Sequence, residues 1–181
     1  AGKTVRDAVR RVVLTTETSG LGPGHRVIEL ACVEMLGLRV TGKFIHMYLN
    51  PERDIDPAAS AVHGLSEEFL ADKPRFRDVA ADFVAFVRGA ELVMHHAPFG
   101  EEYLDHELDL IDLPPLKKIG TGIIDTLVMA RKRRPDSKNS IEALCDRYRI
   151  DIEHRPFHGT LLDAQITAEV FIAMDAEPES L

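Results

Sequence analysis

The sequence of 181 residues lacks any apolar run approaching the roughly 20 residues that a membrane-spanning helix needs. Cysteine is also scarce: Cys32 and Cys145 both lie in apolar surroundings, which excludes a disulfide framework and suits a reducing compartment. The segment 1–11 alternates charged and small side chains without an apolar centre, so we expect no secretory signal. These absences predict a cytoplasmic protein that does not enter a membrane.

Positive charge is in deficit, because 22 Lys+Arg face 30 Asp+Glu and the net charge is −8. This balance excludes a broad basic face that coats nucleic acid, but it leaves room for a short strand gripped through metal ions. One basic run, Arg131-Lys132-Arg133-Arg134, is followed closely by Lys138 and is either a solvated helix end or a phosphate contact. The hydrophobic fraction of 45% is too high for a disordered chain, and the length favours one domain with a packed core.

The chain begins with extended segments and continues with alternating helical and extended ones. Glycine-containing turns separate the first three extended segments, which predicts an antiparallel meander. Strands followed by strand–helix alternation favour a mixed sheet covered by helices. From periodicity, we predict strands over 11–16, 26–36, 38–49, 90–94 and 123–124, and helices over 76–87, 99–111, 126–133 (capped by Asp125), 139–148 and 161–174.

Three polar residues could carry chemistry, but each has an ordinary explanation when taken alone. Glu17 at a strand end is typically a solvated rim residue. His158 before Gly159 is typically a surface histidine, although histidine is the commonest acid–base group. Asp163 in a first helical turn typically stabilises the helix dipole. None of them indicates a site by itself.

Five ordered blocks of sequence change this interpretation. Together they resemble the DEDD-type 3′–5′ exonucleases with a catalytic histidine, and among these the proofreading epsilon subunits of bacterial DNA polymerase III. The resemblance extends from about residue 11 to residue 174. The blocks are VLTTETSG at 13–20, VHGLS at 62–66, HHAPFGEEYL at 95–104, NSIEALC at 139–145 and HGTLLDA at 158–164. The family patterns are V-L-D-T-E-T-T-G, V-H-G-I-[ST], H-N-A-x-F-D-x-x-F-L, N-S-L-D-A-L-C and H-x-A-L-x-D-A.

The resemblance implies a ribonuclease-H-like α/β fold. We expect a five-stranded mixed sheet whose first three strands are antiparallel, with helices on both faces. The exonuclease-type domain is expected over 11–175, with an N-terminal extension over 1–10 and a C-terminal tail over 176–181. An isolated domain of this kind is expected to be a monomer.

The resemblance also implies a two-metal hydrolysis of DNA 3′ ends. In the family, four carboxylates hold two Mg²⁺ or Mn²⁺ ions and a histidine activates the attacking water. The four acid positions fall on Thr15, Glu17, Gly100 and Asp163, and the histidine falls on His158. On the substrate side, the family's histidine falls on His63 and an acid common in a P-E-A segment falls on Ala58; Thr16, Thr18 and Phe99 are the other expected substrate contacts.

Two of the four acid positions depart from the family pattern. Thr15 offers a neutral hydroxyl and Gly100 offers no side chain. Glu17 and Asp163 supply a charge of about −2, whereas two divalent ions carry about +4. Glu101 lies on a different side of a helix from position 100, so compensation by Glu101 or Glu102, or by His96, is not expected. We therefore expect at most one weakly held ion and an activity that is lost or very weak.

Two other functions remain open on the same fold. The chain could be a non-catalytic module that keeps its partner surfaces, or an exonuclease acting on RNA ends. By resemblance, the expected partners are the 3′ end of single-stranded DNA, the polymerase subunit and a small accessory subunit. Sliding-clamp binding is not expected, because Pro178-Glu179-Ser180-Leu181 lacks the glutamine and the aromatic residue of the clamp motif Q-x-x-[LM]-F.

Overall fold

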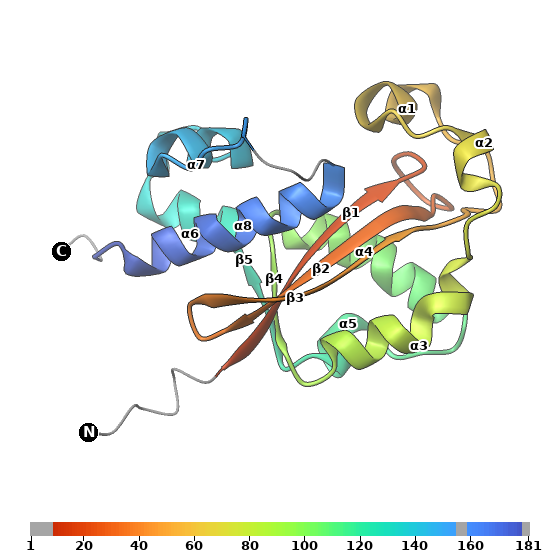
Figure 1. Cartoon of the computed structure of the whole chain (residues 1–181), viewed down its shortest axis with the longest axis horizontal. Helices are drawn as coiled ribbons and strands as arrows, with labels where there is room; N and C mark the ends of the chain where they lie inside the picture. The colour runs from red at the N-terminus through yellow and green to blue at the C-terminus, as the bar shows by residue number, and fades with distance from the viewer. Residues whose placement is uncertain (1–8, 155–158, 179–181) are drawn as a thin grey trace.

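The computed structural model describes residues 9–154 and 159–178 (Figure 1). A five-stranded sheet with the strand order β3-β2-β1-β4-β5 forms its centre. β1 pairs antiparallel with β2 and β2 with β3, whereas β1, β4 and β5 run parallel. This confirms the predicted mixed sheet and its antiparallel first three strands. The strands are β1 (Arg10–Thr18), β2 (Val27–Leu36), β3 (Arg39–Tyr48), β4 (Glu91–Met94) and β5 (Gly122–Asp125).

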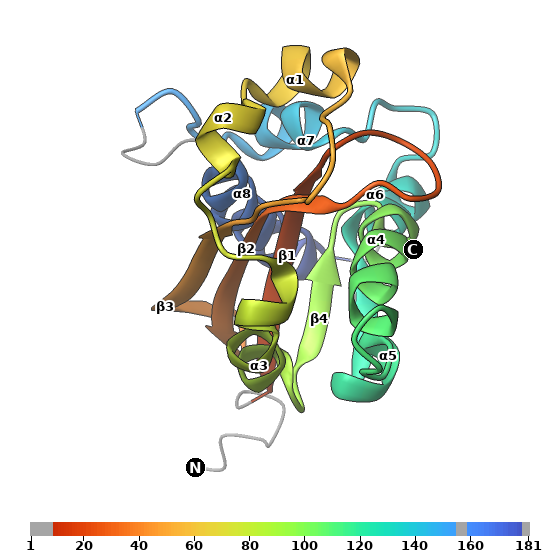
Figure 2. The ribbon, with the colours of Figure 1, turned by 90° about the vertical axis from the view of Figure 1, so that its right-hand side faces the viewer.

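Helices cover both faces of the sheet, as predicted (Figure 2). The long helix α8 packs on one face against β1 and β2, and α3, α4 and α5 pack on the other. None of the helices in the described part of the chain has the length and apolarity required to cross a membrane. The helices are α1 (Pro57–His63), α2 (Glu67–Leu70), α3 (Phe76–Val87), α4 (Ala97–Asp109), α5 (Leu116–Ile119), α6 (Thr126–Arg133), α7 (Ile141–Tyr148) and α8 (Gly159–Ala176).

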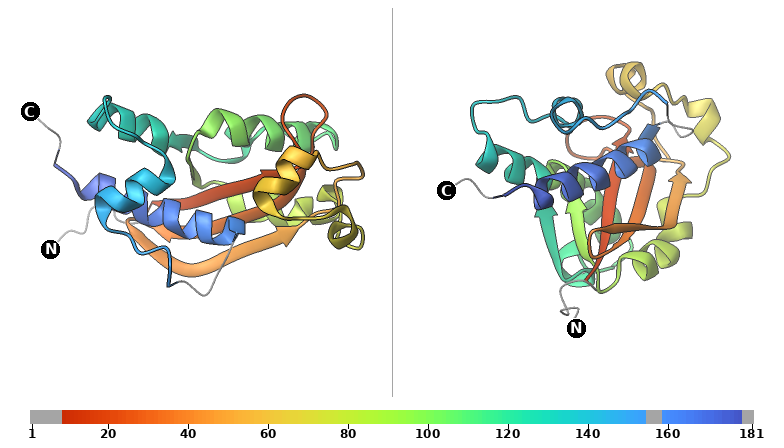
Figure 3. Two further views of the ribbon diagram at one scale, coloured as in Figure 1. Left: turned by 90° about the horizontal axis from the view of Figure 1, so that it is seen from above. Right: turned by 60° about the vertical axis from the view of Figure 1, so that its left-hand side comes forward.

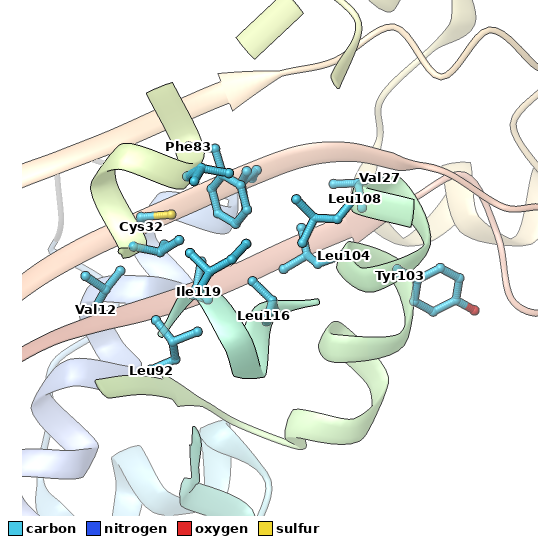
Figure 4. Close-up of a cluster of buried hydrophobic side chains, with 14 of the residues drawn as sticks. Val12, Val27, Cys32, Phe83, Leu92, Tyr103, Leu104, Leu108, Leu116 and Ile119 are labelled. Carbon is cyan, nitrogen blue, oxygen red and sulfur yellow. The ribbon is translucent and has the colours of Figure 1, made fainter. Parts of the chain in front are cut away.

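The central strand β1 explains why two layers of helices are needed. Side chains alternate between the faces of a strand, and β1 is apolar on both. Val12 and Leu14 belong to the core beneath α3, α4 and α5 (Figure 4), whereas Val13 packs with α8. All three are essentially inaccessible to solvent. A strand buried on both faces holds a fixed position, so the residues at its end are placed firmly.

Helix α4 fixes the loop between β1 and β2. The ring of Tyr103 lies at one end of the core cluster in Figure 4, and its hydroxyl accepts a hydrogen bond of 2.8 Å from the backbone N–H of Gly22. Glu107 is 1% exposed and accepts two hydrogen bonds from Arg26, of 2.7 and 2.8 Å, and one of 3.1 Å from the N–H of Val27. The start of β2 is thereby attached to α4.

The predicted segments agree with the observed ones to within two residues or so, and three short helices were not predicted. Helix α1 begins with a proline and is followed by Gly64, whose φ of 70° favours a residue without a Cβ. It buries none of its side chains, so it has no apolar stripe for periodicity to detect. Helices α2 and α5 have four residues each. Figure 3 shows α1 and α2 together at one end of the molecule.

The substitution Glu107→Ala tests this attachment of β2. It leaves the Arg26 guanidinium and the Val27 N–H without their acceptor, so we expect the free energy of unfolding to fall by about 2–4 kcal/mol in urea titrations. The control Asp109→Ala changes an exposed carboxylate on the same helix and should stay within about 0.5 kcal/mol of the parent. Equal stability of the two variants would contradict the assignment.

Candidate active site

Two adjoining cavities lie at the end of β1, and they share Thr16 and Phe99. The first has a volume of about 380 Å³ and the second of about 350 Å³. Every described residue that the sequence marked for the site lines one of them. Thr16, Glu17, Thr18, Ala58, His63 and Phe99 line the first, and Thr15, Thr16, Phe99, Gly100 and Asp163 line the second. His158 lies outside the described residues.

Glu17 at the end of β1 and Asp163 in α8 are near enough for the charge of Asp163 to act on Glu17. Partial burial, followed by the charges of Asp163 and Glu29, raises the pKa of Glu17 to about 7. The pKa of Asp163 is raised to about 6 by loss of solvent around its carboxylate and by the charges of Glu142 and Glu29. Both shifts mean that the protein disfavours the ionised forms, so a proton or a cation is favoured at this place.

Glu29 is a component of the site that the sequence analysis did not single out. It is 3% exposed, lies opposite Glu17 in the pairing of β1 with β2, and forms a 2.8 Å contact with Nε2 of His46. Glu29, Ala31 and Val33 stand at alternate positions of β2, so they share one buried face of the strand. A charged residue among apolar residues of one strand face is the signal that could have identified Glu29.

Thr15 joins the central strand to α8 through a hydrogen bond. Its hydroxyl donates a 2.7 Å hydrogen bond to the carbonyl oxygen of Thr160, in the first turn of α8. Thr15 lies opposite Ala31 on the strand face that packs against this helix. A carboxylate in its place would face the same carbonyl oxygen and repel it. The hydroxyl therefore suits a junction that holds its shape by itself.

Gly100 is buried in α4, and the space beside it is taken by a neighbour. A Cβ at this position would collide with the terminal methyl carbon of Met94, while Oγ1 of Thr16 would be 4.0 Å away. The methyl is the mobile end of a flexible side chain, so a larger residue requires Met94 to adopt another rotamer. Neither Glu101 nor Glu102 lines either cavity, and Glu101 forms a 3.4 Å ion pair with Lys117.

His63 presents a hydrogen-bond donor at the first cavity. Its Nδ1 accepts a 3.0 Å hydrogen bond from the backbone N–H of Leu65, so the proton of the neutral ring is on Nε2. Nε2 is buried and has no partner at full hydrogen-bond geometry among the described residues, although the backbone of Thr18 lies near the ring. Burial lowers the pKa of His63, which keeps the ring neutral. A buried donor without a partner is suited to an oxygen atom of a ligand.

The donors around the second cavity do not fit a pair of divalent ions. Within residues 9–154 and 159–178, no group of three or more His, Cys, Asp or Glu side chains is arranged to hold a metal ion. Glu17 and Asp163 are the two carboxylates at the expected acid positions. Ions such as Mg²⁺ require several oxygen ligands, so this set matches at most one ion that keeps most of its water.

The chain is similar in sequence to proteins of a known family. A family model described as Exonuclease matches residues 12–171. This chain belongs to the exonuclease family. It is 44% identical over 176 residues to DNA polymerase III subunit epsilon of Rickettsia prowazekii, covering 96% of the chain and 77% of the relative. It is 45% identical over 180 residues to the epsilon subunit of Escherichia coli K12, covering 95% and 74%. The resemblance to the epsilon subunits is confirmed.

Solved structures with the same fold include two other exonucleases. Exonuclease X in complex with 5′ overhanging duplex DNA superposes with a TM-score of 0.72 at 28% identity, covering 91% of this chain and 90% of the other. Exonuclease I superposes with a TM-score of 0.79 at 16% identity, covering 92% of this chain and 41% of the other. At this lower identity, the second likeness shows the fold alone.

The raised pKa of Glu17 makes stability depend on pH. The unfolded chain loses this proton near pH 4.5 and the folded chain near pH 7, so the free energy of unfolding falls as pH rises between these values and stays lower above them. We expect Glu17→Gln to flatten this slope. Because solvent screening at the open site reduces the effect, we expect a gain in stability of about 1 kcal/mol at pH 8.

Denaturant titrations at pH 4.5, 6, 7 and 8 measure this slope. The control Glu102→Gln removes an exposed carboxylate that lines neither cavity and should keep the parent's pH profile. If Glu17→Gln also keeps the parent's pH profile, folding does not raise the pKa of Glu17.

Restoring the two missing acids should destabilise the chain in the absence of metal. The double variant Thr15→Asp/Gly100→Asp loses the Thr15–Thr160 hydrogen bond, displaces Met94 and adds two like charges. We expect a loss of about 1–3 kcal/mol with chelator present. Thermal melts should show a larger gain on adding Mg²⁺ than for the parent.

The matched control is Thr15→Asn/Gly100→Asn, which has the same shape without the charges. The difference between the two double variants in chelator isolates the repulsion among carboxylates. Equal melting temperatures in chelator would show that repulsion contributes nothing at this site.

Proposed function

We propose that the chain binds the 3′ end of a single DNA strand and hydrolyses it very slowly or not at all. The observation that carries this proposal is an asymmetry within the site. The residues expected to contact the strand end line a formed cavity, whereas two of the four expected metal ligands are a hydroxyl, Thr15, and a bare backbone, Gly100.

The first cavity supports the binding half of this proposal. Its walls carry the apolar side chains of Ala58, Val62 and Phe99, which suit the face of a nucleobase. Nε2 of His63 supplies a donor for an oxygen of the terminal nucleotide. Membership of the epsilon family and the fold shared with exonuclease X, solved with duplex DNA, support DNA as the ligand.

The second cavity supports the loss of hydrolysis. Asp163 in this cavity and Glu17 in the adjoining one are the carboxylates at the expected ligand positions for a divalent ion, Mg²⁺ or Mn²⁺, which in such enzymes activates water and stabilises the leaving oxygen. Loss of even an outer partner of a metal site costs about 10- to 100-fold in affinity or activity, and here two direct ligands are replaced. His158, the proposed general base, would then lack an activated water to deprotonate.

A non-catalytic role within a replication assembly fits the same observations. The Thr15–Thr160 hydrogen bond joins β1 to α8 directly, which suits a module that keeps its shape rather than turning over substrate. Because the relatives are named as subunits of DNA polymerase III, the polymerase subunit and a small accessory subunit are the proposed partners. The same role places the chain in the cytoplasm.

Release of nucleotides from a mismatched 3′ end tests the proposal. We expect the parent chain to release them at least about 100-fold more slowly than Thr15→Asp/Gly100→Asp in Mg²⁺. A third variant adds Met94→Ala to the two aspartates and makes room for the side chain at position 100. Thr15→Asn/Gly100→Asn should remain as slow as the parent.

Parallel assays in Mn²⁺ and with RNA ends separate the other possibilities. A parent rate close to that of the aspartate variants would contradict the ligand assignment. Faster cleavage of RNA than of DNA by the restored variants would favour an RNA-end exonuclease. Tight binding of DNA ends by the parent, without cleavage in either metal, is the result expected.

A further inference from the structure

A third cavity continues the candidate active site toward α6 and α7. Its volume is about 470 Å³, and it shares His95 and Ser140 with the second cavity. Its other polar lining residues are Arg131, Ser137 and Asn139. The three cavities therefore form a connected series, from the first through the second to the third, and a strand held in the first can extend along them.

Arg131 differs from its neighbours in the basic run. Arg133 donates a 2.9 Å hydrogen bond to the carbonyl oxygen of Met174, and Arg134 donates one of 2.9 Å to Glu177. These two arginines hold the end of α8. Arg131 is exposed and forms no hydrogen bond or ion pair with any described residue. Among the described lysines and arginines, it alone lines one of the three cavities.

The loop opposite Arg131 is held in a fixed shape from inside. Asn139 is 8% exposed, and its amide donates two hydrogen bonds of 3.1 Å, to the carbonyl oxygens of Arg134 and Ser137. Arg147 donates to Oδ1 of Asn139 at 3.1 Å and to the carbonyl oxygen of Lys138 at 2.7 Å. The wall of the cavity is thus formed before any ligand binds, which lowers the entropic cost of binding.

The donors on this wall match a phosphodiester group. The hydroxyl oxygen of Ser140 accepts a 3.2 Å hydrogen bond from the N–H of Ala143, so its own hydrogen is directed elsewhere. Ser137 contributes a second hydroxyl to the lining. A guanidinium with neighbouring hydroxyl donors is a typical set of contacts to nucleic-acid phosphates. In a chain with a net charge of −8, a single cation here has a large effect on a polyanion.

We infer that the third cavity binds a backbone phosphate of the same DNA strand whose 3′ end occupies the first cavity, and that Arg131 is its principal contact. This inference rests on the proposed function. It extends the site from the terminal nucleotide to a strand of several nucleotides, because the second cavity lies between the first cavity and the one that Arg131 lines.

Binding of oligothymidylates tests the inference. Fluorescence anisotropy is measured in Mg²⁺ with strands of two and of eight nucleotides, joined by phosphorothioate linkages at the 3′ end to resist cleavage. For the eight-nucleotide strand, we expect Arg131→Ala to raise Kd roughly 5- to 10-fold and to reduce the slope of log Kd against log salt by about one. The two-nucleotide strand should bind the variant and the parent alike.

Two control variants keep the result specific. Lys132→Ala removes the adjacent exposed cation, which lines none of the three cavities, and should change Kd much less than Arg131→Ala. Arg131→Lys retains the charge and should recover most of the affinity. Equal effects of Arg131→Ala and Lys132→Ala, or equal effects on both strand lengths, would overturn the inference while leaving the proposed function intact. Failure of the parent to bind either strand would instead overturn the proposed function itself.

Discussion

The packing of α8 across β1 and β2 is the constraint on which the site depends. The apolar side chains Val13, Ala164 and Phe171 form one buried cluster between the sheet and this helix. Burial of such a cluster stabilises the fold and offsets the cost of placing two carboxylates near each other. It brings Asp163 beside Glu17, although like charges repel. The packing therefore determines where the carboxylates lie. Their mutual repulsion favours a proton or a cation at that place.

The surroundings of Glu17 and Asp163 remain negatively charged, although Thr15 and Gly100 stand at the other two expected acid positions. Glu29, buried opposite Glu17, adds its charge from the sheet, and Glu142 adds another from α7. Both act on Asp163, and Glu29 acts on Glu17 as well. A place of this kind still attracts a cation, but attraction differs from coordination, which requires several oxygen atoms at fixed distances. The negative field at this place is therefore separable from the proposed loss of metal ligands at positions 15 and 100.

The sequence predicted the sheet and the longer helices from two signals: α3 and α7 have a strong apolar periodicity, whereas α8 is rich in apolar residues around most of its circumference. It did not predict α1, which has no fully buried side chain and is recognisable only by its proline start and the glycine that follows it. Motif order predicted the site residues, and the described ones line two adjoining cavities. The partner of Thr15 could not be predicted, since a backbone carbonyl 145 residues away leaves no trace in the side-chain pattern.

At both positions that depart from the family pattern, a neighbouring group completes the local packing or hydrogen bonding. This argues against substitutions to which the rest of the site has not adapted. At position 15 the hydroxyl finds the carbonyl oxygen of Thr160, and at position 100 the methyl of Met94 takes the space of a side chain. A void or an unpaired polar group at either place would cost stability, and neither is present at these two positions. His63, whose Nε2 is buried, and the exposed guanidinium of Arg131 still line cavities. A buried donor gains free energy when a ligand accepts from it, and an exposed guanidinium exchanges water for a phosphate at little cost, so both groups fit the proposed binding of a strand end.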